Sequence, residues 1–153
     1  KKMNLALNSL LWRLHPDGHW RSGAGKWVSD WESTALCLEA FLSADSDRQF
    51  GSALAPVIEN LMGNLDAWMA TAPSFEEEGA SNATLASALL CSVLIRCEKY
   101  YDGYFDIDQN SLLLMHDYLY NCLSSITGST HADLRQFCTI PQIAAYSALA
   151  VAS

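Results

Sequence analysis

The chain has 153 residues, about the size of one domain; half of them are hydrophobic and 17% are charged. This composition is too apolar and too weakly charged for a disordered chain, and 8 Gly and 4 Pro exclude collagen-like and low-complexity classes. No stretch of about 18 apolar residues lacks a charge or a glycine, so we expect no membrane span. We expect one domain over residues 1–153.

The charge balance restricts the class of partner. The chain has 9 Lys and Arg against 17 Asp and Glu, which gives a formal net charge of −8. A nucleic-acid binder needs a basic face to displace counterions, so we expect no nucleic-acid partner. A basic protein or a neutral apolar ligand fits this charge better.

The cysteines and the N-terminus predict a cytoplasmic protein. Four of the five cysteines lie inside apolar helical patterns, none forms a C-x-x-C pair, and the number is odd. The chain begins with a basic stretch but has no apolar segment with a cleavage site after it. We therefore expect buried, reduced thiols at Cys37, Cys91, Cys97, Cys122 and Cys138.

Apolar residues at helical spacing predict a first helix over residues 4–14. His15-Pro16-Asp17-Gly18 ends it, because Pro disfavours the α conformation before it and Asp-Gly favours a turn. A loop follows over residues 16–30. The next helix is predicted over residues 31–44 with Asp30 as its N-cap, and it is apolar nearly all round, as buried helices are.

The rest of the chain continues the helical pattern. Residues 47–72 are amphipathic, and Pro56 should kink or split this helix at Ala55. No run of alternating β-branched and polar residues predicts a strand, so the chain is expected to be all-α. Three more helices are predicted over residues 82–101, 109–127 and 141–152, the last beginning with Pro141.

Helices rich in small residues recur along the chain. They include residues 33–36, 83–86 and 143–146, and each follows a more amphipathic helix and a polar loop. This repeat predicts about three helical hairpins, each an outer helix followed by an inner one. Small residues let the inner helices pack closely into one wall.

One stretch resembles a known family. Leu10-Leu11 is followed by His15-Pro16-Asp17-Gly18-His19-Trp20 and then by Asp30-Trp31-Glu32-Ser33-Thr34-Ala35-Leu36-Cys37-Leu38-Glu39-Ala40. This order resembles a repeat of the terpenoid cyclase and protein prenyltransferase family, which has a leucine-rich helix, Q-x-P-D-G-x-W and D-x-x-x-T-A-x-x-L-x-A-L. The match covers residues 10–42, and Leu14 stands where the family has Gln.

The resemblance implies an α/α toroid of inner and outer helices. A complete ring of that family has about twice as many helices as the six expected here. The chain is therefore predicted to be an all-α, toroid-like stack of about three helical hairpins, a partial or half barrel. The remaining half of the toroid, or another subunit, would complete it.

The resemblance also implies candidate acids. The cyclase branch protonates its substrate with a D-x-D-D motif, in which one Asp is kept protonated by its neighbours. Asp106 and Asp108 match the first two acids, but Gln109 replaces the third; Asp30 and Glu32 match only loosely. The alternative is that paired carboxylates at a helix start serve as a cap, and we expect Asp108 to be mainly a cap.

Metal and nucleophile motifs are not recognised. The prenyltransferase branch holds zinc with Asp, Cys and His, but His15, His19, His116 and His131 lie far apart or across a turn. G-x-S-x-G and G-x-x-x-x-G-K are also missing from the sequence. We expect no metal and no cofactor.

Two aromatic groups lie on predicted loops or beside them. Such residues either brace the helices or form a wall for an apolar or cationic guest. For Trp20 we predict bracing of the loop after the Asp-Gly turn. As candidate ligand-binding residues we name Trp20, Trp27, Trp31, Tyr104 and Phe105.

Two functions follow from these observations. The first is a terpenoid-cyclase-like or prenyltransferase-like domain that binds an apolar, isoprenoid-type ligand, with acid-catalysed cyclisation as its chemistry if it is an enzyme. The alternative is a non-catalytic acidic interaction module that masks a basic partner, as immunity proteins mask toxins. An aromatic-lined pocket with a carboxylate favours the first, and a filled core with an acidic groove favours the second.

Overall fold

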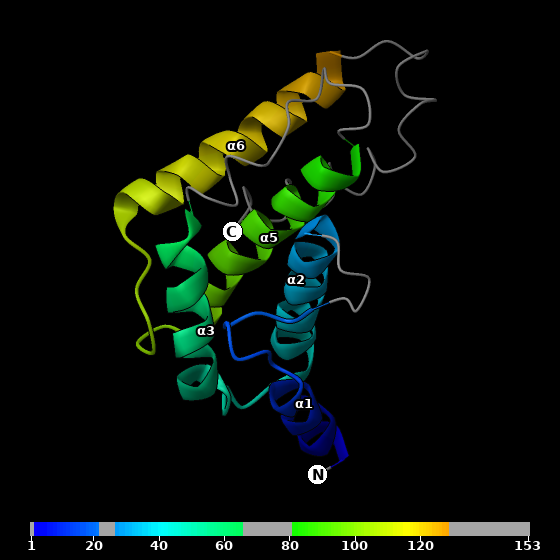
Figure 1. The fold of residues 1–153 in the computed structure, drawn as a ribbon. Coiled ribbons are helices and arrows are strands. Elements are labelled where there is room, and N and C mark those ends of the chain that lie inside the picture. The colour runs from blue at the N-terminus through cyan, green and yellow to red at the C-terminus, as the bar shows by residue number, and fades with distance from the viewer. Residues whose placement is uncertain (1, 22–26, 66–80, 129–153) are drawn as a thin grey trace.

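The computed structural model describes residues 2–21, 27–65 and 81–128, and these residues form five helices and no strand (Figure 1). This confirms the all-α class for the part of the chain that is described. None of these helices is both long and apolar enough to cross a membrane. The helices are α1 (Lys2–Trp12), α2 (Trp27–Ala44), α3 (Gly51–Gly63), α5 (Ser81–Tyr100) and α6 (Gln109–Gly128).

The helices alternate in direction along the chain. In Figure 1, α1, α3 and α6 run upward, whereas α2 and α5 run downward. The most extensive contact between helices joins α2 and α5, and α6 packs on α5. The two helices that run downward are therefore direct neighbours, although they are separated in sequence by α3.

The predicted bounds of α1, α5 and α6 agree with the structure to within two residues, whereas the start of α2 and both ends of α3 do not. The helix begins at Trp27, so the prediction that Asp30 is its N-cap is wrong. Asp30 lies inside the first turn, where its carboxylate still faces the positive end of the helix dipole. The predicted helix over residues 141–152 lies outside the described residues.

Of the two outcomes predicted for Pro56, a kink or a split, the split is wrong. Helix α3 is continuous from Gly51 to Gly63 with Pro56 inside it, so it is not split at Ala55. The ring of Pro56 is exposed, while Leu54 and Val57 on either side are buried in the core. Burial of that face holds the helix together although one backbone hydrogen bond is lost. Helix α3 ends before Asn64 and not at residue 72; residues 66–80 lie outside the described part.

Helix α5 is the centre of the core. From Ser87 to Cys97 every side chain except Arg96 is buried, as the pattern of small and apolar residues predicted. Helix α2 differs from the prediction, because Ala35 and Leu38 are fully buried but Leu36 is 49% exposed. A helix that is apolar nearly all round can still leave one side exposed, because its sequence alone does not determine which side packs against other helices.

A buried carboxylate closes the corner between α2 and α3. Asp45 is 2% exposed, and its carboxylate accepts hydrogen bonds from the backbone N–H groups of Gln49 and Phe50, each at 2.9 Å. The hydroxyl of Tyr101 donates to the same carboxylate at 2.9 Å, and Tyr100 donates to the Asp45 carbonyl. Asp45 therefore satisfies free N–H groups at the start of α3 and ties this corner to the end of α5.

An ion pair joins the two central helices. Both terminal nitrogens of Arg96 on α5 donate to the two carboxylate oxygens of Glu39 on α2. Both side chains are largely covered, so this fork-to-fork pair is better shielded from water than a surface pair.

Candidate functional site

The loop between α1 and α2 contains the Pro-Asp-Gly turn. The N–H of Gly18 donates to the carbonyl of His15 at 2.9 Å, and the N–H of His15 donates to the carbonyl of His19 at 3.1 Å. Gly18 has a φ of +91°, and a Cβ there would collide with the side chain of Asn60 on α3. Asn60 also donates to the carbonyl of Asp17 at 3.0 Å, so the turn is held against α3.

Trp20 links this loop to both flanking helices. Its side chain is 3% exposed, and its indole N–H donates to the carbonyl of Leu10 at 2.8 Å. Its backbone N–H donates to the hydroxyl of Thr34 at 3.1 Å, and that hydroxyl donates back to the Trp20 carbonyl at 3.2 Å. The predicted bracing contact is therefore present, and the indole N–H already has a partner inside the protein.

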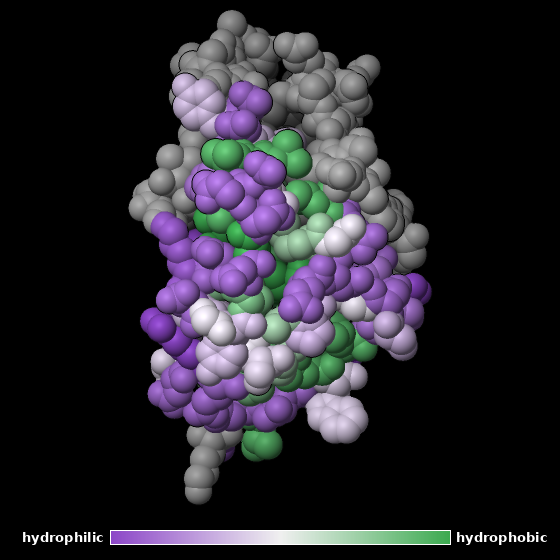
Figure 2. Space-filling view, turned by 90° about the vertical axis from the view of Figure 1, so that its left-hand side faces the viewer, coloured by the Kyte–Doolittle hydropathy of each residue, from purple (hydrophilic) through white to green (hydrophobic). Residues whose placement is uncertain are grey.

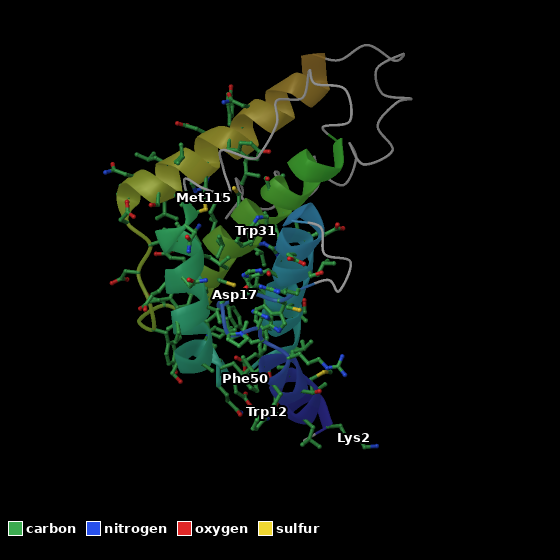
Figure 3. All side chains as sticks on the ribbon, viewed as in Figure 1. Lys2, Trp12, Asp17, Trp31, Phe50 and Met115 are labelled. Carbon is green, nitrogen blue, oxygen red and sulfur yellow. The ribbon has the colours of Figure 1, made fainter. Side chains whose placement is uncertain are left out.

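The same loop gathers charged side chains around Asp17, near the centre of Figure 3. The Nδ1 atoms of His15 and His19 lie 2.8 and 3.2 Å from Oδ1 of Asp17, and Arg21 lies 2.6 Å from Oδ2. The Nε2 atom of His19 lies 3.9 Å from Asp30 on α2. His19 thus has a carboxylate near each ring nitrogen.

The spacing of the histidines did not predict this cluster. Pro16 and Gly18 exclude a helical pair of His15 and His19, but the turn folds both imidazoles onto one carboxylate. The signal that points to it is a His on each side of a Pro-Asp-Gly turn. The described residues include no group of three or more His, Cys, Asp or Glu side chains able to hold a metal ion.

The surroundings of Asp17 keep it ionised. Desolvation raises the pKa of this carboxyl, but the hydrogen bonds from Arg21 and His15 and the nearby charges of His19 and Arg21 outweigh it. The pKa of Asp17 therefore lies below its usual value.

Asp106 and Asp108 lie on the loop between α5 and α6, and both side chains are exposed. Asp108 caps α6: its carboxylate accepts the Ser111 backbone N–H at 2.9 Å and the Ser111 hydroxyl at 2.6 Å. These bonds, the hydroxyl first, lower the pKa of Asp108. The cap expected at Asp108 is present, and an ionised carboxylate is a poor proton donor at neutral pH.

The other predicted site residues divide between two loops. Near the α1–α2 loop, Trp31 is 7% exposed, with its ring centre 5.2 Å from that of His19, and Glu32 is half-buried beside it. Near the α5–α6 loop, Phe105 is buried while Tyr104 is 47% exposed. The side chain of Trp27 is outside the described part.

Both loops contact α3, but at different places. The α1–α2 loop meets it at Asn60, and Tyr104 lies against Gly51, where a Cβ would collide with the ring. The structure thus brings Trp20, Trp31 and Asp30 into one neighbourhood, with Tyr104, Phe105 and Asp108 on a separate loop.

The thiols that are described are unsuited to nucleophilic catalysis. Cys37 and Cys97 are free thiols, and Cys91 and Cys97 are buried. Burial raises the pKa of Cys37 to about 11 and that of Cys97 to about 12. Both thiols therefore stay protonated at neutral pH.

Comparison of the chain with protein-family models, curated proteins and solved structures found no match.

Proposed function

We propose that this chain is one part of an α/α toroid that binds an apolar, isoprenoid-type ligand, its ring completed by further helices or by another subunit. The observation that carries the proposal is the bonding of Trp20 to Leu10 and Thr34. These residues belong to the three segments of the repeat that resembles terpenoid cyclases and prenyltransferases. The spacing of that repeat places the three residues where they can form these hydrogen bonds.

The arrangement of the helices supports the same proposal. A toroid has neighbouring inner helices that run in one direction and outer helices that run in the other. Helices α2 and α5 are neighbours that run in the same direction, and α1, α3 and α6 run opposite to them (Figure 1). Since fold alone does not fix function, the ligand must be tested directly.

Binding, and not acid catalysis, is the core of this proposal. Asp108 is occupied as the cap of α6, which leaves Asp106 as the candidate acid if a cyclisation reaction occurs. We place the protein in the cytoplasm, and the free thiols of Cys37 and Cys97 support a reducing compartment.

The experiment is titration with geranylgeraniol, monitored by tryptophan fluorescence, with hexanol as the short-chain control. We expect a saturable change with geranylgeraniol alone, because a longer apolar chain buries more surface. Equal responses to both alcohols, or no saturable response, would contradict ligand binding.

Catalysis is tested separately by incubation with geranylgeranyl diphosphate and analysis for cyclised products. If the protein is a cyclase, Asp106→Asn should remove the product and Asp108→Asn should not. Saturable binding without product would identify a binding domain.

A second function, an acidic protein-interaction module, is favoured by the surface of the α5–α6 loop and α6. Asp102, Asp106, Asp108 and Asp117 are all exposed, and no Lys or Arg occurs after Lys99 as far as Gly128. This segment therefore presents a negative surface to a basic partner.

A further inference from the structure

Helix α6 has apolar residues on two opposite sides. Met115 and Leu119 are fully buried in the core. On the other side Leu113 is 51% exposed and Tyr120 is 64% exposed, with Asp117 exposed between them. The spacing of four and then three residues puts these three side chains on one stripe. Leu114, 42% exposed, borders it. We call these four residues the outer face of α6.

The outer face is unusual because large apolar side chains there remain in water. Exposed apolar residues scattered singly need no explanation, but a row along one helix marks an interaction site. Figure 2 shows the side of the molecule where α6 begins, on which apolar residues lie among polar ones. The stripe from Leu113 to Tyr120 spans about 10 Å, or two helical turns.

The charge around this face selects the partner. Asp117 lies within it, and Asp106 and Asp108 lie just before the start of α6. The cap geometry keeps the carboxylate of Asp108 ionised. A second copy of the chain would bring the same acids against these and be repelled. Nucleic acids and anionic membranes are excluded by the same sign of charge.

We propose that the outer face of α6 is a docking site for a basic amphipathic helix of another protein. The proposal rests on the interaction function and not on the apolar ligand. The partner's apolar residues, at positions i, i+3 or i+4, and i+7, pack on Leu113 and Tyr120. Its Lys or Arg residues flank them and pair with Asp117 and Asp106. Apolar contact supplies affinity, and charge supplies orientation and rate of association.

The test uses a fluorescent model peptide, an amphipathic helix of Leu and Lys, with a Glu-for-Lys analogue as control. Binding to the full chain is measured by anisotropy for Leu113→Ser/Tyr120→Ser and for Asp117→Lys. The matched control is Leu5→Ser/Trp12→Ser, which also removes two exposed apolar side chains, at 69% and 89% exposure, but on α1. Circular dichroism checks that each variant is folded.

We expect the Leu-Lys peptide to bind, more weakly at high salt, and the Glu analogue not to bind. Each α6 variant should weaken binding by at least about tenfold, and the α1 variant should not. If the peptide binds all variants equally, the α6 site is wrong although an acidic interaction function survives. If neither peptide binds, the interaction function itself fails. Self-association that Leu113→Ser/Tyr120→Ser abolishes would assign the face to a second copy and overturn the proposal.

Discussion

At the scale of single residues, Trp12 and Trp20 are eight positions apart, but one is exposed and the other is buried. Trp12 is 89% exposed at the end of α1, in the lower part of Figure 3. Trp20 is 3% exposed and bonded to two helices through its indole and its backbone. The aromatic ring of Trp20 also packs against Phe41, with ring centres 6.2 Å apart.

We predict that Trp20→Ala lowers the free energy of unfolding by about 3–5 kcal/mol, because it removes a buried aromatic ring and an indole hydrogen bond. Trp12→Ala should change it by less than about 0.5 kcal/mol, since little is buried there. Urea denaturation compares the two. Similar losses in both variants would mean that Trp20 does not brace the loop.

Asp17 makes stability depend on pH in the acid range. Its folded pKa is depressed, so its contribution is fully present above the unfolded value of about 4 and is lost as pH falls through the folded pKa. We predict that wild type loses more stability than Asp17→Asn between about pH 5 and about pH 2. Denaturation across this range measures the difference.

The control for the Asp17 experiment is Asp102→Asn, which removes one exposed carboxylate elsewhere. This variant should follow the wild-type pH dependence more closely than Asp17→Asn does. If both variants change the pH dependence to the same extent, general charge repulsion explains it and the contacts of Asp17 do not.

At the scale of elements, α3 is held by its buried face more than by its intrinsic propensity. Helix α3 includes a proline and has no side-chain cap at Phe50, yet it is continuous. Its buried residues and the bonds that Asp45 accepts from Gln49 and Phe50 compensate for both weaknesses.

We predict that Pro56→Ala stabilises the protein, by up to about 3 kcal/mol, because residue 56 regains an N–H that can donate to Ser52. Thermal denaturation measures the change, and the exposed Ser52→Ala on the same helix is the control, expected within about 0.5 kcal/mol. A less stable Pro56→Ala would mean that proline's restriction of the unfolded chain outweighs the lost bond.

At the scale of the whole molecule, helices and their order were predictable because apolar residues recur at helical spacing. Tertiary features were not. Nothing local distinguishes Asp45, which is buried, from Asp47, which is exposed two residues later. The start of α2 was misplaced because Asp30 looks like a cap, whereas it lies inside the helix near His19.

The candidate site was predictable only where its contacts join residues that are close in sequence within a helix start. The cap at Asp108 follows from an Asp three residues before Ser111 at a helix start. The grouping of His15 and His19 around Asp17 depends on the path of a turn, which spacing rules for helices do not describe.

The central position of α5 has a consequence for synthesis of the protein. Arg96 follows its partner Glu39 by 57 residues, so the ribosome releases α2 well before the helix that packs on it. During that interval the apolar face of α2 lacks its main partner and is open to chaperones or to other nascent chains. Closing so long a loop also costs entropy before the α2–α5 contact is gained. The core around α5 therefore packs only after α5 has left the ribosome.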